Sequence, residues 1–100
     1  MEDMTLNGDV RSKIKNLVSG LFNDRIFDIN FIEHLDLITD LGMDSLTFIS
    51  MIIEIEVQFN ITVSDNLLFM ENFANINDIV EIIENEILII ERLEEDYKSA

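Results

Sequence analysis

The stretch "DLGMDSLTFI", Asp40 to Ile49, joins a glycine-containing loop to an apolar helical pattern and places Ser45 directly behind an aspartate. Asp44 is a good helix N-cap, and the pattern after it predicts a helix that continues to about Phe59. A nucleophilic serine needs a neighbouring proton acceptor, because the neutral hydroxyl is weakly reactive. The chain has one histidine, His34, and no cysteine. An enzyme built around Ser45 is therefore the least favoured function.

Length and composition predict one compact domain. The 100 residues are enough for a single core, which we expect to cover about residues 6–91 with frayed ends. Without cysteine there is no disulfide framework, so a reducing cytoplasm suits the chain. No signal pattern is present, and apolar runs such as Ile87–Ile90 fall far short of the about 20 residues that span a bilayer. We expect a soluble, cytoplasmic protein.

The charge is strongly acidic and unevenly distributed. The chain has 21 acidic and 6 basic residues, a formal net charge of −15, and no lysine or arginine from Ile26 through Glu91. Such a surface repels nucleic acid and anionic membranes and attracts proteins with basic patches, so the rate of encounter with such proteins should fall with added salt. The same charge also keeps a 48% apolar chain soluble.

Helical periodicity also precedes this stretch. Apolar residues at helical spacing from Val10 to Leu21 predict a helix of roughly 12 to 14 residues, for which Asn7 or Asp9 can serve as N-cap. Residues 23–43 show no sustained helical period but remain rich in apolar side chains. Such a long apolar connection must lie over a core, and connections of this length are usually functional or disordered.

Two further helices are predicted after Asn60. Ser64 or Asp65 can cap a short helix over Asn66–Met70. A last helix follows Asn75, with an apolar stripe from Ile76 to Ile90, and the charged residues from Arg92 onward predict a frayed end. The stretch 59–66 is the one place where an extended segment fits the sequence. No proline and only three glycines leave an all-α reading of three main helices and one short helix.

The segment "LGMDSL", Leu41 to Leu46, resembles the attachment-site motif of free-standing acyl and peptidyl carrier proteins. The resemblance extends to a helix about 30 residues upstream and to "IEIEVQFNITV" downstream, over most of Val10 to Ile90. It implies a small four-helix bundle, three main helices plus one short helix, of acyl-carrier-protein type. It also implies that Ser45, flanked by Asp44 and Leu46, holds a covalent 4′-phosphopantetheine.

The resemblance explains the lone serine, because a separate phosphopantetheinyl transferase supplies the metal and base and takes the arm from coenzyme A. The carrier then presents acyl or aminoacyl groups as thioesters to loading enzymes and ketosynthase-type synthases, as a monomer that catalyses nothing. The position agrees with helix physics, since first-turn N–H groups and the helix dipole favour a phosphate ester at Ser45. The alternative is that Asp44 and Ser45 only cap the helix and have no further role.

The sequence departs from the fatty-acid carrier pattern at two positions. Thr47 and Ser50 stand where that pattern commonly has acidic residues, and about two residues are inserted around Met70–Phe73. The resemblance therefore leaves open fatty-acid synthesis and a specialised pathway that makes a polyketide, a nonribosomal peptide or an unusual lipid.

The predicted helix 45–59 carries two apolar stripes. The stripe through Phe48, Met51, Ile52, Ile55 and Phe59 is expected to face the core. The opposite stripe is expected to dock partners, together with the polar residues beside it: Leu46, Ile49, Ile53 and Val57, flanked by Thr47, Ser50, Glu54 and Glu56. A helix buried on all sides is the alternative.

Two other functions compete with the carrier assignment. Asp36, Asp40 and Asp44 precede a helix, but a calcium loop starting at Asp36 would need an oxygen ligand at Ile38 and a glutamate at Thr47. His34 lacks a second metal ligand nearby in sequence, so no metal site is predicted. An acidic helical adaptor without a prosthetic group would have the same composition, and modification of Ser45 distinguishes the two functions.

Overall fold

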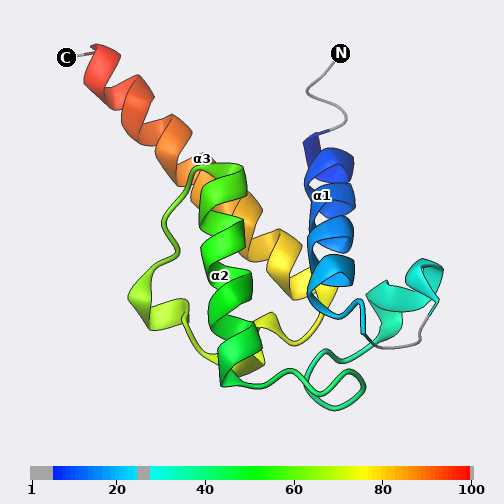
Figure 1. The fold of residues 1–100 in the computed structure, drawn as a ribbon. Helices are drawn as coiled ribbons and strands as arrows, with labels where there is room; N and C mark the ends of the chain where they lie inside the picture. The colour runs from blue at the N-terminus through cyan, green and yellow to red at the C-terminus, as the bar shows by residue number, and fades with distance from the viewer. Residues whose placement is uncertain (1–5, 25–27, 100) are drawn as a thin grey trace.

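Three α-helices form a small bundle in the computed structural model, which describes residues 6–24 and 28–99 (Figure 1). Short 3-10 turns lie in the connections, and no strand occurs in these two ranges, as the all-α prediction requires. In chain order the elements are α1 (Leu6–Leu21), η2 (Ile29–His34), α2 (Ser45–Phe59), η3 (Asp65–Leu67), η4 (Met70–Phe73) and α3 (Ile76–Ser99).

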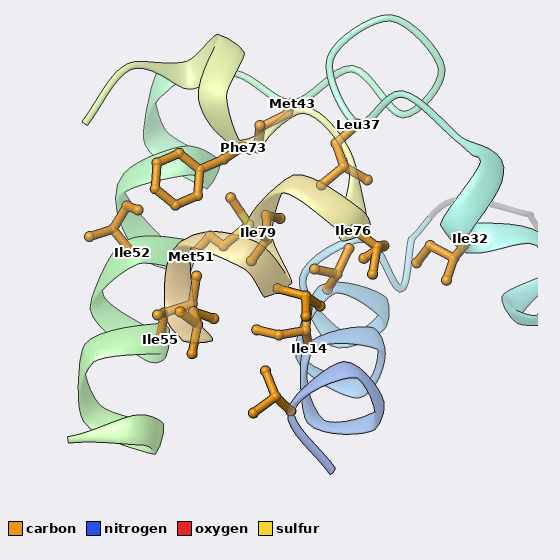
Figure 2. Close-up of a cluster of buried hydrophobic side chains, with 14 of the residues drawn as sticks. Ile14, Ile32, Leu37, Met43, Met51, Ile52, Ile55, Phe73, Ile76 and Ile79 are labelled. Carbon is orange, nitrogen blue, oxygen red and sulfur yellow. The ribbon is translucent and has the colours of Figure 1, made fainter. Parts of the chain in front are cut away.

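The core lies where the inner faces of the three α-helices meet, and α1 contacts both α2 and α3. Figure 2 shows Ile14 of α1, Met51 of α2 and Ile79 of α3 among the side chains that fill this space. These side chains are fully buried. β-Branched residues lower helix propensity slightly, but burial of an apolar stripe outweighs this cost.

The first helix is longer than the sequence predicted. It begins at Leu6, so Asn7 and Asp9 lie inside the helix and cannot be its N-cap. Asp9 instead forms an ion pair with Lys13 one turn later, at 3.3 Å. The residue before Leu6 lies outside the described ranges.

The predicted short fourth helix is two separate 3-10 turns. Ser64 occupies the N-cap position of η3 but makes no side-chain bond to that turn, and its hydroxyl donates to the Glu86 carboxylate at 3.2 Å. Phe73 in η4 is fully buried, with its ring 5.4 Å from that of Phe48 of α2. The chain between residues 61 and 75 is therefore held by core contacts rather than by a continuous helix.

The start of α3 was predicted correctly, and its end was not. The Asn75 side chain accepts a hydrogen bond from the Asp78 N–H at 2.9 Å and donates one to the Asp78 carboxylate at 3.0 Å. At the other end, α3 continues to Ser99, whereas fraying was expected from Arg92. Glutamate, leucine, arginine and lysine are good helix formers, which explains why the charged sequence continues the helix.

A polar network ties the connection between α1 and α2 to the bundle. The Arg11 guanidinium donates to the Glu33 carboxylate at 2.8 Å and to the Asn77 side-chain oxygen at 2.6 Å. Glu33 belongs to η2, and Asn77 to the first turn of α3. Beside Glu33, Ile32 is fully buried. One charged side chain of α1 thus fastens both η2 and α3.

The network predicts a pH-dependent stability. The hydrogen bond from Arg11 lowers the pKa of Glu33 below its usual 4.5, and burial opposes this effect. Because the pKa of Glu33 is lower in the folded protein, the ionised carboxylate stabilises the fold at every pH above the pKa of the unfolded chain. This contribution is lost as the pH falls through the pKa of the folded protein. When the pH is lowered from about 7 to about 3, the unfolding free energy of the Glu33→Gln variant should therefore fall by less than that of wild type. Urea denaturation at each pH measures both changes.

Glu71→Gln is the matched control, because Glu71 is an exposed glutamate in η4. It removes one carboxyl without touching the Arg11 contacts. If Glu33→Gln and Glu71→Gln show the same acid sensitivity as wild type, the Glu33 pair does not contribute to the pH dependence.

Candidate functional site

Ser45 is the first residue of α2, and its side chain is exposed to solvent. Asp44 is the N-cap, as predicted: its carboxylate accepts a hydrogen bond from the Thr47 N–H at 2.8 Å. Its carbonyl accepts from the Phe48 N–H at 2.9 Å and so begins the helix. The N–H groups of the first turn have no carbonyl partners within the helix. The Ser45 hydroxyl therefore lies at the positive end of a well-capped α2.

The loop before Ser45 is anchored in the core. Leu37, Leu41 and Met43 are buried, and Figure 2 shows Leu37 and Met43 pointing toward the bundle interior. The Leu37 N–H donates to the Ala74 carbonyl at 2.6 Å, and the Met43 N–H donates to the Leu37 carbonyl at 2.8 Å. Gly42 has a φ of 72°, a conformation that glycine adopts without strain. The chain can therefore reverse between two buried residues and still expose Ser45.

Two aspartates, Asp36 and Asp40, shape this loop through hydrogen bonds to backbone N–H groups. The Asp36 carboxylate accepts hydrogen bonds from the N–H groups of Ile38 and Thr39, each at 2.9 Å. The Asp40 carboxylate accepts from the Asp36 N–H at 2.7 Å. The bond from Thr39 is the largest cause of a pKa of Asp36 below its usual 3.8. In the described part of the chain, no three histidine, aspartate or glutamate side chains are grouped to hold a metal ion.

The two faces of α2 differ sharply in exposure. Met51, Ile52 and Ile55 are buried, and Phe48 and Phe59 are partly buried against the core. The opposite face bears four aliphatic side chains that are 53% to 75% exposed, which we call the α2 strip: Leu46, Ile49, Ile53 and Val57. The predicted burial of the first stripe is confirmed, and the alternative of a helix buried on all sides is wrong. Leu46 places the strip directly beside Ser45.

The polar residues of the predicted docking surface do not all lie with the strip. Glu54 is exposed, and Thr47 and Ser50 are half-buried. The Glu56 carboxylate accepts a hydrogen bond from the Val63 N–H at 3.0 Å, which fastens the segment after α2. Asn60, in the left-handed conformation with a φ of 54°, ends the helix. Glu56 is therefore engaged in the fold, and the exposed part of this face is mainly aliphatic.

The Ser45 hydroxyl and the chain's histidine lie in different elements of the fold. His34 lies in η2, where its ring is 6.2 Å from that of Phe31. The Asp44 carboxylate beside Ser45 accepts the Thr47 N–H. Sequence reasoning missed the residues that hold the loop from a distance, Phe73 and Ala74, because only their burial and backbone bonds reveal this role. In the sequence, the signal available for this role was an aromatic residue, Phe73, in the inserted segment.

Residues 12–83 match the family model described as "Phosphopantetheine attachment site". The chain is 30% identical over 84 residues to an acyl carrier protein of Thermotoga maritima, a match that covers 84% of this chain and 99% of that protein. It is 42% identical over 52 residues to an acyl carrier protein of Phytoplasma mali, covering 52% of this chain and 60% of that protein. The family match includes all of α2 and the loop that precedes it.

Proposed function

The chain belongs to the acyl carrier protein family, and from this premise we propose that Ser45 is the residue to which 4′-phosphopantetheine is attached. A protein of this family carries acyl groups as thioesters and is not itself an enzyme. The observation that supports Ser45 is its exposed hydroxyl on the first turn of α2, behind a loop whose apolar residues are buried. Asp44 and Leu46 flank the attachment point.

The residues at this point suit a phosphodiester. The Ser45 oxygen would form the ester, and the first-turn N–H groups of α2 and its dipole would stabilise the negative charge. Thr47 and Ser50 are uncharged, so the next turn adds no anionic side chain at these positions. When attached, the arm supplies the thiol that holds the acyl group, and the protein supplies placement and recognition.

We propose that a phosphopantetheinyl transferase and the loading and synthase enzymes dock on the α2 strip. The strip adjoins Ser45 through Leu46 and leaves three further aliphatic side chains open to solvent. Its neighbours Thr47 and Ser50 replace the acidic residues common in fatty-acid carriers, which favours a specialised biosynthetic pathway. Glu54 supplies an exposed carboxylate near the strip for a basic side chain of the partner.

We also propose where the carrier works and in which oligomeric state. No described helix combines the length and the apolarity needed to cross a membrane. A formal net charge of −15 opposes association of two copies as well as binding to nucleic acid or anionic lipid. We propose a carrier that works as a monomer in the cytoplasm, where the chain needs no disulfide.

Conversion by a transferase tests the proposed function. Purified protein is incubated with coenzyme A and a broad-specificity phosphopantetheinyl transferase, and the intact mass is measured. We expect a gain of one phosphopantetheinyl group and the appearance of one reactive thiol, because the chain has no cysteine of its own. No mass gain in a folded sample would contradict the proposal and would favour an acidic adaptor without a prosthetic group.

Docking on the α2 strip predicts a kinetic effect without a loss of stability. A variant with Ile49→Gln, Ile53→Gln and Val57→Gln removes exposed aliphatic surface and keeps the net charge. We expect this variant to be modified at least about tenfold more slowly than wild type, because it buries less apolar surface against the transferase. A loss of about 1.4 kcal/mol in binding free energy corresponds to a tenfold loss of affinity. Initial rates at sub-saturating carrier measure this effect, and thermal unfolding followed by circular dichroism checks the fold.

Gln58→Ala is a control on an exposed residue of α2 outside the strip. We expect wild-type modification rates for this variant. Equal rates for the strip variant and wild type would mean that the transferase docks on another surface.

A further inference from the structure

The last part of α3 extends beyond the region that defines the family. The family match ends at residue 83, and α3 continues to Ser99. Figure 1 shows this end of α3 projecting past α2, away from the rest of the bundle. The helix is longer than the core requires, because its fully buried residues end at Ile83.

This extension has a second apolar side that does not face the core. The side that faces the bundle continues from Ile83 through the partly buried Ile87 and Ile90. Leu88, Ile89 and Leu93 are 52% to 62% exposed, and we call these three side chains the α3 patch. Ile89 and Leu93 are one helical turn apart, as are Leu88 and Arg92, so the patch and Arg92 share one face.

The α3 patch has a definite shape and a definite charge around it. An open hollow in the surface is lined by Asn85, Leu88, Ile89 and Arg92. Arg92 lines the hollow itself, and Glu84 and Glu91 lie beside Leu88, four residues before it and three residues after it. The exposed Leu88 and Ile89, with the carboxylates of Glu84 and Glu91 at their edge, are complementary to an apolar surface bordered by positive charge.

The charges distinguish between the kinds of occupant. A second copy would place two acidic extensions of a chain of net charge −15 against each other, and an anionic lipid surface would be repelled. An amphipathic helix lays its apolar face into a groove through residues at i, i+3, i+4 and i+7. Lysine or arginine beside that face would meet Glu84 and Glu91, which lie next to Leu88 on α3.

We propose that the α3 patch is a second docking surface, separate from the α2 strip, which binds an amphipathic helix with a lysine- or arginine-bordered apolar face on a partner protein. A carrier with such a surface can be held by its α3 extension while Ser45 and the α2 strip remain accessible to the enzymes that act on the arm. The surface binds whether or not Ser45 is modified, so it is independent of the proposed attachment site.

A labelled model peptide tests this docking surface. The probe is a synthetic amphipathic helix of leucine and lysine, titrated with the full-length protein and followed by fluorescence anisotropy. A leucine and glutamate peptide of the same pattern is the charge control. One protein variant carries Leu88→Gln, Ile89→Gln and Leu93→Gln, which keep the charge and use a good helix former. The matched variant carries Ile49→Gln, Ile53→Gln and Val57→Gln on the α2 strip.

We expect the leucine and lysine peptide to bind wild type and the α2 variant equally, and to bind the α3 variant at least about tenfold more weakly, a difference of 1.4 kcal/mol. The glutamate peptide should bind weakly to all three. Equal binding to the α3 variant, or a loss only in the α2 variant, overturns the proposal. Sedimentation showing a wild-type dimer that the α3 variant abolishes assigns the patch to a second copy and also overturns it.

Modification by the transferase separates this proposal from the proposed function. The α3 variant should be converted by the transferase at the wild-type rate, because the α3 patch lies on a different helix from Ser45. Circular dichroism should show the same helical content and unfolding temperature in the variant and in wild type. Peptide binding without any conversion would contradict Ser45 as attachment site and leave the α3 patch intact.

Discussion

Ser45→Ala is expected to abolish phosphopantetheinylation completely, with no mass gain after prolonged incubation with coenzyme A and transferase. In the proposed attachment the Ser45 hydroxyl supplies the oxygen of the phosphodiester, and alanine has no group that can replace it. The fold should survive, because the Ser45 side chain is exposed and the Asp44 carboxylate caps α2 by accepting a hydrogen bond from the Thr47 N–H. Loss of modification with the helical structure unchanged would therefore be due to the missing hydroxyl alone.

Other serines provide the controls for this experiment. Ser50 lies farther along α2 and is half-buried, and Ser64 precedes η3 with its hydroxyl bonded to Glu86. Ser50→Ala and Ser64→Ala should each gain one phosphopantetheinyl group as wild type does. A mass gain retained in Ser45→Ala, or lost in Ser64→Ala with the fold intact, would place the attachment site elsewhere.

Ile52→Ala is expected to lower the unfolding free energy by about 2 to 5 kcal/mol, whereas Ile53→Ala should change it by no more than about 0.5 kcal/mol. The two isoleucines are neighbours in α2, and 8% of Ile52 is exposed against 55% of Ile53. Truncation of the buried side chain removes apolar contacts and leaves a cavity in the core. Truncation of the exposed one opens no cavity.

Urea denaturation followed by circular dichroism measures both changes, with the slope against urea checking that unfolding stays two-state. Because the substitution is identical, differences in helix propensity cancel between the two variants. Equal destabilisation of both would mean that the faces of α2 have been assigned wrongly, and the α2 strip could then no longer be offered as a docking surface.

The helix that carries Ser45 was predictable because its signals are local. Asp44 and Asn60 set its ends, and both act there through their own side-chain or backbone preferences. Its two apolar stripes were visible in the spacing of residues, and the wider one, with both phenylalanines, is the buried one. The position of the candidate site and the exposed aliphatic face beside it followed from these patterns.

Features that depend on distant residues were not predictable. η2 has no sustained helical pattern, and its position depends on Arg11 of α1 and Asn77 of α3. Glu56 was placed with the partner surface because sequence spacing cannot show that its carboxylate turns to the Val63 N–H. The length of α3 was underestimated because a charged sequence is equally compatible with a frayed tail and a solvated helix.

The bond between the Leu37 N–H and the Ala74 carbonyl also affects the order of events during synthesis. It joins the loop before α2 to the residues just before α3, so the loop takes its final shape only after the chain has closed across a long intervening segment. On the ribosome, Ser45 leaves the exit tunnel well before Ala74 does. If a transferase recognises the folded loop, we therefore expect modification of Ser45 to follow the synthesis and folding of the residues around Ala74.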